Sequence, residues 1–391
     1  MNLVSLGRTQ LVVPQLALGA LPIQRASMQD ATRLLRAAFA AGIRFFDTAR
    51  AYSDSEEKIG NALADVRSQI IIATKTAATD AAGARRDLET SLTKLRTSYI
   101  DIIQLHNPEN VPQPDDEGST YAALSAARRQ GLVRFIGITN HRAAVAREAV
   151  ASGLFDTLQF PLSHISSAED LSLVEHCRQH DVGFIAMKAL CGGLLTNVVA
   201  AFAFFRQLHG VLPIWGIQHD RELAQFLELE RNPPELTEAL TAAIEQDRKD
   251  LAASFCRGCG YCLPCAAEIP IPMAARMSFL LRRAPYRQFL TEDWKAKMRR
   301  ISDCSGCQSC VAKCPCRLEL PVLLKTMLAD FEQFVREHGA FGVTSASPTL
   351  HLCLGFHLPA RRHVRRTNGT SDCIRGTGRA PQTFLVCGTL D

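Results

Sequence analysis

Eight short apolar runs alternate with helix-like segments between residues 15 and 216, and few folds accommodate this order. Strands that alternate with helices form a parallel sheet, because each helix carries the chain back to the edge where the next strand begins. Eight such units in about 200 residues favour a closed (β/α)8 barrel of the TIM type over an open sheet. The expected strands are Leu16–Gly19, Arg44–Phe46, Ile70–Thr74, Ile100–Leu105, Val133–Thr139, Thr157–Phe160, Phe184–Met187 and Leu212–Trp215. The expected helices include Asp30–Ala41, Glu56–Leu63, Arg85–Leu95, Tyr121–Gln130 and Leu171–His180.

The chain is expected to contain more than this barrel. Residues 2–13 (NLVSLGRTQLVV) are predicted to form a hairpin that closes the barrel floor. A charged helical stretch follows the barrel and breaks at Pro233 and Pro234. From residue 341 the chain has no Lys and no Glu, so this end is predicted to be disordered or an out-of-frame extension. The predicted regions are the barrel (1–230), a helical connector (231–255), a cysteine-rich domain (256–338) and a disordered basic tail (339–391).

Charge and hydropathy argue against two classes of protein. The net charge is +5, and residues 340–391 carry most of it with six Arg and two Asp, so the rest is nearly neutral and is not expected to bind nucleic acid. The most apolar stretch, Leu194–Phe205, is shorter than the about 20 residues of a membrane span. The N-terminus lacks the basic and apolar regions of a signal peptide. We therefore expect a cytoplasmic protein without a membrane partner.

Ionisable residues follow three consecutive strands of the predicted barrel. Asp47 and Tyr52 follow the second strand, Lys75 ends the third and His106 ends the fourth. Barrel chemistry takes place at the C-terminal ends of the strands. Tyr52 would donate a proton to a developing alkoxide, and a nearby ammonium is expected to lower its pKa of about 10. Asp47 would hold Lys75, His106 would polarise the carbonyl, and a cofactor must supply hydride. Taken singly, each residue also has a structural reading as a cap or a solvated group.

The segment GIRFFDTARAY, followed by SEEKIGNAL, is similar to the signature of the aldo/keto reductase family. The resemblance runs from about residue 3 to 230, and it implies a catalytic tetrad of Asp47, Tyr52, Lys75 and His106. It also implies that the barrel binds NADP(H) or NAD(H) without a Rossmann domain. The cofactor positions implied by the resemblance are Asn140, Gln159, Gly193 and Leu194.

Two cofactor positions depart from the family pattern. Met187 stands where many relatives stack a Tyr on the nicotinamide. Gln218 and Glu222 stand where relatives often carry basic residues for the 2′-phosphate of NADP, and only Arg221 is basic in this segment. The sequence therefore leaves the choice between NADP and NAD open.

Nine of the 14 cysteines lie between residues 256 and 316. In a reducing compartment such clustering indicates metal ligands rather than disulfides. The first motif is CRGCGYCLPC and the second is CSGCQSCVAKCP, whose spacing and trailing proline match the bacterial ferredoxin run. Paired CxxC motifs also hold zinc, which is the alternative.

Two 4Fe-4S clusters are expected from these two motifs. In two-cluster ferredoxins the fourth cysteine of each run binds the other cluster. The first cluster would use Cys256, Cys259, Cys262 and Cys314, and the second would use Cys304, Cys307, Cys310 and Cys265. The whole arrangement resembles a subset of bacterial and archaeal aldo/keto reductases that carry a C-terminal ferredoxin-like module.

These features together predict an NAD(P)H-dependent oxidoreductase that reduces an aldehyde or ketone and carries two 4Fe-4S clusters. The alternative is a non-catalytic or electron-relay module that binds the nicotinamide and passes electrons to a partner protein. Retention of Tyr52 and Lys75 favours the first, because simple cofactor binding does not need a proton-transfer pair. The sequence does not identify the substrate.

Overall fold

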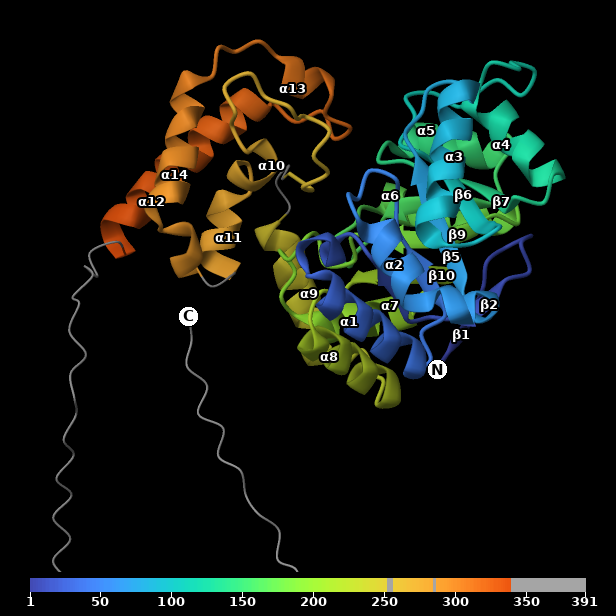
Figure 1. The fold of residues 1–391 in the computed structure, drawn as a ribbon. Coiled ribbons are helices and arrows are strands. Elements are labelled where there is room, and N and C mark those ends of the chain that lie inside the picture. Colours follow the sequence, from blue (N-terminus) through green and yellow to red (C-terminus); the bar gives the residue numbers. More distant parts are fainter. Residues whose placement is uncertain (252–255, 284–285, 339–391) are drawn as a thin grey trace, which may run out of the picture. The chain divides into compact units, whose positions relative to one another are not determined.

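Eight parallel strands close into a barrel in this computed structural model, which describes residues 1–251, 256–283 and 286–338 (Figure 1). The strand order around the barrel is β10-β3-β4-β5-β6-β7-β8-β9, so each strand pairs with its neighbours in the chain. The predicted barrel and all eight predicted strands are confirmed. The strands are β3 (Ala17–Gly19), β4 (Phe45–Asp47), β5 (Ile71–Thr76), β6 (Ile100–His106), β7 (Val133–Thr139), β8 (Thr157–Pro161), β9 (Gly183–Met187) and β10 (Val211–Gly216).

The register of the barrel brings the ends of neighbouring strands to one level. Gly19 pairs with Asp47, and His106 pairs with Thr139, which pairs in turn with Gln159. These residues therefore share the C-terminal rim, where the loops of a β/α barrel build its site.

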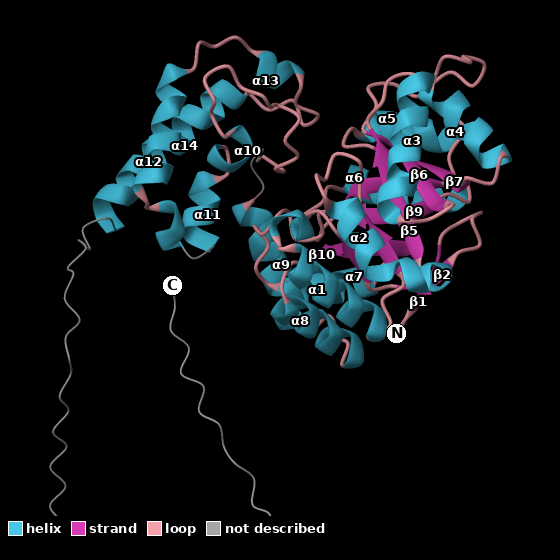
Figure 2. Ribbon diagram, viewed as in Figure 1, coloured by secondary structure: helices cyan, strands magenta, loops and turns pink. Residues whose placement is uncertain are grey.

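Helices cover the outside of the barrel and bury one face against it (Figure 2). The first of them shows the local rules. Ser27 caps its start by accepting a hydrogen bond from the Asp30 amide at 3.1 Å, and its buried face includes Leu34 and Leu35. Each fully buried leucine contributes roughly 1.5–3 kcal/mol. The helices are α1 (Met28–Ala40), α2 (Ser55–Leu63), α3 (Ala81–Leu95), α4 (Thr120–Arg129), α5 (Ala143–Ala151), α6 (Ala168–Gln179), α7 (Val198–Arg206) and α8 (Asp220–Arg231).

A hairpin closes the barrel floor, as predicted. Strands β1 (Leu3–Ser5) and β2 (Val12–Pro14) pair antiparallel. Their inward side chains Val4 and Val13 belong to the same buried cluster as Phe45 inside the barrel. Water is thus kept out of the barrel from the end opposite the catalytic rim.

The region after the barrel is helical. Helix α9 (Glu238–Asp250) begins after a break at residues 232–237, which contains the two prolines expected to interrupt it. The later helices pack around buried Leu280, Met298, Leu324 and Phe331. In the described ranges, no helix is long and apolar enough to cross a membrane. The predicted tail at 339–391 lies outside the described residues. The helices are α10 (Ile271–Ala274), α11 (Met277–Arg283), α12 (Glu292–Arg299), α13 (Ser309–Ala312) and α14 (Leu320–His338), with short 3₁₀ turns at Tyr286–Phe289 and Arg300–Asp303.

Candidate functional site

A buried ion pair lies at the C-terminal rim of the barrel. Lys75 Nζ donates to both carboxylate oxygens of Asp47, at 2.7 and 2.8 Å, and to the Thr48 carbonyl at 2.7 Å. Lys75 is 1% exposed and Asp47 is 2% exposed. Burial raises the pKa of Asp47 and lowers that of Lys75, while their mutual attraction opposes both shifts. Because all three hydrogen-bond directions of the ammonium are used, its position is fixed.

Tyr52 lies beside this pair, in the loop that precedes α2. The Lys75 ammonium sits 5.2 Å from the centroid of its ring. The sequence-based expectation of a Tyr52 pKa below its usual value is wrong, because other effects outweigh the charge of this ammonium. Burial, the charge of Asp47 and the nearby Tyr261 together hold the Tyr52 pKa well above its usual value. The phenol is therefore protonated at neutral pH.

His106 completes the group at the end of β6. Its ring meets that of Tyr52 edge-on, with 6.1 Å between centroids. Burial and the Lys75 charge lower the pKa of His106 to about 3, so the imidazole is neutral at physiological pH. A neutral imidazole can donate one hydrogen bond and accept another. The structure thus brings all four predicted catalytic residues to one place.

The predicted nicotinamide positions line the same rim. Gln159 accepts from Gln104 Nε2 at 2.9 Å and directs its own amide toward Asp47 Oδ2 at 3.5 Å. The Asn140 side chain is fully buried, donates to the Pro108 carbonyl and accepts from the Arg142 amide, both at 2.9 Å. Asn140 is thus already bound within the protein. At the end of β9, Met187 is 9% exposed.

Thr139, the last residue of β7, has a polar group without a partner among the described residues. Its side chain is 1% exposed, and within the described ranges its hydroxyl has no hydrogen-bond partner. Unpaired buried hydroxyls are uncommon and often mark a place where a ligand binds. Sequence reasoning missed this residue.

The glycine loop after β9 is held by the cysteine-rich region. The Arg276 guanidinium is 6% exposed and donates to the Cys191 and Gly192 carbonyls, both at 3.3 Å. Gly192 has a φ of +67°, which glycine adopts without strain, and a Cβ there would lie 2.7 Å from Arg276 Nη1, so a larger residue would press on this guanidinium. Of the predicted loop residues, Gly193 has a φ of +90° and Leu194 is fully buried.

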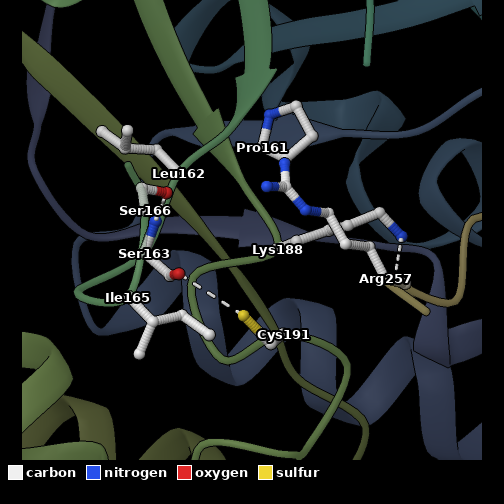
Figure 3. Close-up of a pocket in the computed structure, with 8 residues that line it drawn as sticks. All are labelled: Pro161, Leu162, Ser163, Ile165, Ser166, Lys188, Cys191 and Arg257. Atoms are coloured by element: carbon white, nitrogen blue, oxygen red, sulfur yellow. Dashed lines mark hydrogen bonds between the residues drawn. The ribbon is translucent and has the colours of Figure 1, made fainter. Parts of the chain in front are cut away.

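A small cavity of about 30 Å³ lies beside this loop, where Lys188 and Arg257 meet (Figure 3). Lys188 Nζ donates to the Arg257 carbonyl at 3.3 Å, and Cys191 Sγ lies 3.4 Å from the Ser163 hydroxyl. The cavity is lined by Pro161, Leu162, Ser163, Ile165, Ser166, Lys188, Cys191 and Arg257. It joins the ends of β8 and β9 to the first cysteine motif.

The other predicted cofactor residues lie at the start of α8. Glu222 caps this helix by accepting from the Gln218 amide at 2.7 Å and the His219 amide at 3.1 Å. Gln218 borders an open hollow of about 530 Å³. Three arginines line this hollow, which are Arg25, Arg33 and Arg221. Arg25 and Arg33 lie near the start of the barrel sequence, far from α8, so the sequence around α8 alone could not predict their presence here.

The thiols of the first predicted cluster lie near one another. Cys259 and Cys314 both act electrostatically on Cys256, and Cys256 and Cys259 act on Cys262. The Gly258 amide donates to Cys256 Sγ at 3.4 Å. Burial raises the pKa of the Cys262 thiol to about 12, so iron would have to displace its proton. Cys314 and Cys310 of the second motif both approach the first motif, and the crossed ligand set, which assigns only Cys314 to it, stays a prediction.

Three thiols of the second predicted set are also neighbours. Cys304 and Cys307 both raise the pKa of Cys310, after burial as the main cause. Each thiolate of a cubane binds a different iron atom, so these ligands need not meet at one point. Among the residues that the structure describes, no group of three His, Cys, Asp or Glu side chains could hold a single metal ion.

Two further residues at the rim were missed by sequence reasoning. Tyr261, from the first cysteine motif, lies edge-on to His106 with 6.5 Å between ring centroids. It also lies edge-on to His141, at 5.3 Å. No local sequence signal places Tyr261 there, because the contact joins segments more than 100 residues apart.

The barrel and its Asp-Tyr-Lys-His group define a β/α-barrel oxidoreductase, and comparisons with known proteins agree. The model of the aldo/keto reductase family matches residues 15–203, and that of a 4Fe-4S dicluster domain matches residues 255–319. L-galactose dehydrogenase of Arabidopsis thaliana is 30% identical over 215 residues, which are 50% of this chain and 67% of that protein. Methylglyoxal reductase DkgA of Yersinia pestis is 36% identical over 132 residues, 33% of this chain and 46% of that protein. The chain belongs to the aldo/keto reductase family.

Solved structures show the same barrel. A putative aldo-keto reductase from Pseudomonas aeruginosa matches with a TM-score of 0.53 and 28% identity, over 59% of this chain and 94% of that chain. An aldo/keto reductase from Klebsiella pneumoniae, in complex with NADP and acetate, has a TM-score of 0.52 and 23% identity, over 62% and 94% of the two chains. At that identity the second likeness shows the fold alone. The protein is thus an aldo/keto reductase-type oxidoreductase with a C-terminal 4Fe-4S domain.

Proposed function

We propose that this protein reduces an aldehyde or a ketone with NAD(P)H, by direct hydride transfer at the barrel rim. The observation that carries the proposal is the buried Lys75–Asp47 pair beside Tyr52 and His106. A module that only binds a cofactor has no need for a phenol next to a fixed ammonium. When bound, the nicotinamide supplies the hydride.

The protonation states support reduction. Tyr52 keeps its proton at neutral pH because burial raises its pKa, so it can donate this proton to the oxygen of the new alcohol. The phenolate left behind lies next to Lys75, whose positive charge favours it. Neutral His106 offers a hydrogen bond to the carbonyl oxygen without adding a charge.

The residues at the rim fit a nicotinamide amide. Thr139 is paired in register with Gln159, whose amide is directed toward the Asp47 carboxylate at 3.5 Å. Among the described residues the Thr139 hydroxyl has no hydrogen-bond partner, and a carboxamide, which carries a donor and an acceptor, can bond to it. We assign Asn140 to holding this loop in shape, because both of its polar groups are bonded within the protein. Met187, at the end of β9, would pack on the ring.

We further propose that the cofactor is NADP(H) rather than NAD(H). Arg33 is paired with Asp30 at 2.8 Å and with Asp220 at 3.1 Å, so its charge is balanced. Arg25 and Arg221 line the same hollow beside Gln218. An extra phosphate on the adenosine ribose would gain charge-assisted hydrogen bonds from these two arginines. Glu222 caps the helix and is not among the residues that line the hollow.

We propose that two 4Fe-4S clusters bind to the crossed ligand sets, Cys256, Cys259, Cys262 and Cys314 for one, and Cys304, Cys307, Cys310 and Cys265 for the other. Hydride transfer needs no one-electron step, so the clusters serve here to shape the loop that carries Arg257 and Tyr261. Neighbouring thiols from both motifs and amides such as that of Gly258 support this assignment.

Anaerobic oxidation of NADPH and NADH with a panel of aldehydes and ketones tests the proposal, with wild type beside Tyr52→Phe. We expect turnover by the wild type, and a loss of about 10²–10⁴-fold in kcat for the variant with unchanged cofactor affinity. Tyr99→Phe is a matched control, because Tyr99 lies outside the rim, between α3 and β6. Cofactor binding without turnover by the wild type would favour the electron-relay alternative.

A further inference from the structure

The first cysteine motif reaches into the catalytic group through Tyr261. This residue lies between two predicted cluster ligands, and its ring contacts His106 and His141 edge-on. It is also close enough to Tyr52 for the two phenols to interact electrostatically. Tyr261 therefore stands on the side of the catalytic group that faces away from the barrel strands.

Anchors on both sides hold the loop that carries Tyr261. Upstream, the Arg257 carbonyl accepts from Lys188 Nζ (Figure 3). The Arg257 guanidinium also lies 3.4 Å from Asp170. Downstream, Arg276 donates to the carbonyls of the glycine loop after β9. These contacts tie the motif to the loop after β9 and to the start of α6, and thus hold the loop that carries Tyr261 at the rim.

His141, on the other side of Tyr261, has unused hydrogen-bonding capacity. Its side chain is 7% exposed, and in the described part of the chain neither ring nitrogen has a hydrogen-bond partner. Leaving both nitrogens of a buried imidazole unpaired is costly, and a ligand oxygen that bonds to one of them removes this cost. His141 follows Asn140 directly, so it lies at the rim where the substrate is reduced.

We propose that Tyr261 and His141 form the specificity wall of the reductase pocket, and that this wall selects small carbonyl compounds with a second oxygen group, such as hydroxyaldehydes and hydroxyketones. The carbonyl to be reduced lies at Tyr52 and His106, and the second oxygen bonds to the His141 imidazole. Tyr261 limits the size of the substrate because its ring lies against both His106 and His141. This inference rests on the proposed function and adds the substrate class.

Pairs of substrates that differ only in a hydroxyl test the role of His141. Hydroxyacetone is compared with acetone, and glyceraldehyde with propanal, by kcat/KM. We expect the wild type to prefer the hydroxylated member, and His141→Phe to reduce that preference by about 10- to 100-fold. His141→Gln keeps a donor and an acceptor, so it should recover part of the preference. His209→Phe makes the same change at an exposed residue just before β10 and should leave the preference unchanged.

Tyr261→Ala tests whether Tyr261 selects substrates by size or blocks the pocket for all of them. A wall that fits small substrates predicts lower kcat/KM for hydroxyacetone and higher kcat/KM for a bulky ketone such as benzylacetone. An increase for every substrate would mean that Tyr261 blocks the pocket, and it would overturn the proposal. Iron and sulfide content and the visible absorption of the clusters are measured for each variant, so that cluster loss is not mistaken for a pocket effect.

Different results would overturn the proposed function and the specificity wall. If the wild type reduces no carbonyl compound at all, the proposed function is wrong. If it turns over but shows no preference for the hydroxylated substrates, or if His141→Phe lowers both members of a pair equally with intact clusters, the specificity wall is wrong and the reductase assignment stands.

Discussion

Removing the buried ammonium should destabilise the barrel by an amount that depends on pH. In Lys75→Met the Asp47 carboxylate stays buried and loses its two short hydrogen bonds to Nζ. Breaking a buried pair in this way costs about 3–5 kcal/mol. The carboxylate can avoid part of this cost by taking up a proton. At pH 7 that protonation costs about 4 kcal/mol, because its unfolded pKa is about 3.9 and each unit is about 1.36 kcal/mol.

The sign of the pH dependence follows from the raised pKa of the unpaired carboxyl. A carboxyl whose folded pKa lies above its unfolded value destabilises the protein above about pH 4, and the penalty grows with pH until the folded pKa is passed. The largest loss of stability that Asp47 can cause in this variant is the cost of protonating it, which falls from about 4 kcal/mol at pH 7 to about 1.5 kcal/mol at pH 5. Lys75→Met should therefore lose less free energy of unfolding at pH 5 than at pH 7.

Anaerobic urea unfolding measures this loss. Trp215 is buried in the barrel and the second tryptophan, Trp294, lies in α12, so a Trp294→Phe background leaves a barrel reporter. The Asp47→Asn/Lys75→Met double variant removes the stranded charge and should recover most of the stability at pH 7. The reasoning is refuted if Lys75→Met costs as much at pH 5 as at pH 7, or if the double variant recovers nothing.

Three further predictions concern the pH profile, the clusters and the cofactor. The pKa of His106 lies at about 3 and that of Tyr52 lies above its usual value, so kcat for reduction should change by less than about twofold between pH 5 and 8. A pH profile of kcat with its midpoint near 6.5 would show instead that His106 titrates normally. Cys314→Ala should lower the iron content from about eight to about four atoms per chain, whereas the control Cys177→Ala, in the buried face of α6, should leave it unchanged. Equal iron content in the two variants would contradict the crossed ligand set. Arg221→Ala should raise the KM for NADPH by about tenfold and leave the KM for NADH unchanged, and Arg231→Ala, at the far end of α8, is the control. An equal increase in the KM for both cofactors would exclude a contact between Arg221 and the extra phosphate.

The strands and the catalytic group were predictable because they depend on local sequence. Strands of a β/α barrel are buried on both faces, so they read as short apolar runs. The ionisable residue that ends such a run must then face the rim, which identified Asp47, Lys75 and His106. The helix break at Pro233 was predictable for the same reason, since proline removes a backbone donor.

What the sequence did not predict depends on contacts between distant segments. The raised pKa of Tyr52 arises from burial and from the orientation of Asp47, which neither residue type reveals. Tyr261 reaches the barrel rim from the first cysteine motif, and Arg276 reaches it from the segment between α10 and α11. Arg25 reaches the hollow beside α8 from the turn after β3. An electron-transfer protein partner stays a prediction.

Deuterium tracing tests the central claim of direct hydride transfer in the barrel. The holoenzyme is given NADPH with deuterium in place of both hydrogens on C4 of the nicotinamide, together with a carbonyl substrate that it reduces, under anaerobic conditions in ordinary water. The account predicts one deuterium on the carbinol carbon of the alcohol and no change in the oxidation state of the clusters. An alcohol whose new C–H hydrogen comes from solvent, formed while the clusters are oxidised, would contradict it and favour the electron-relay alternative.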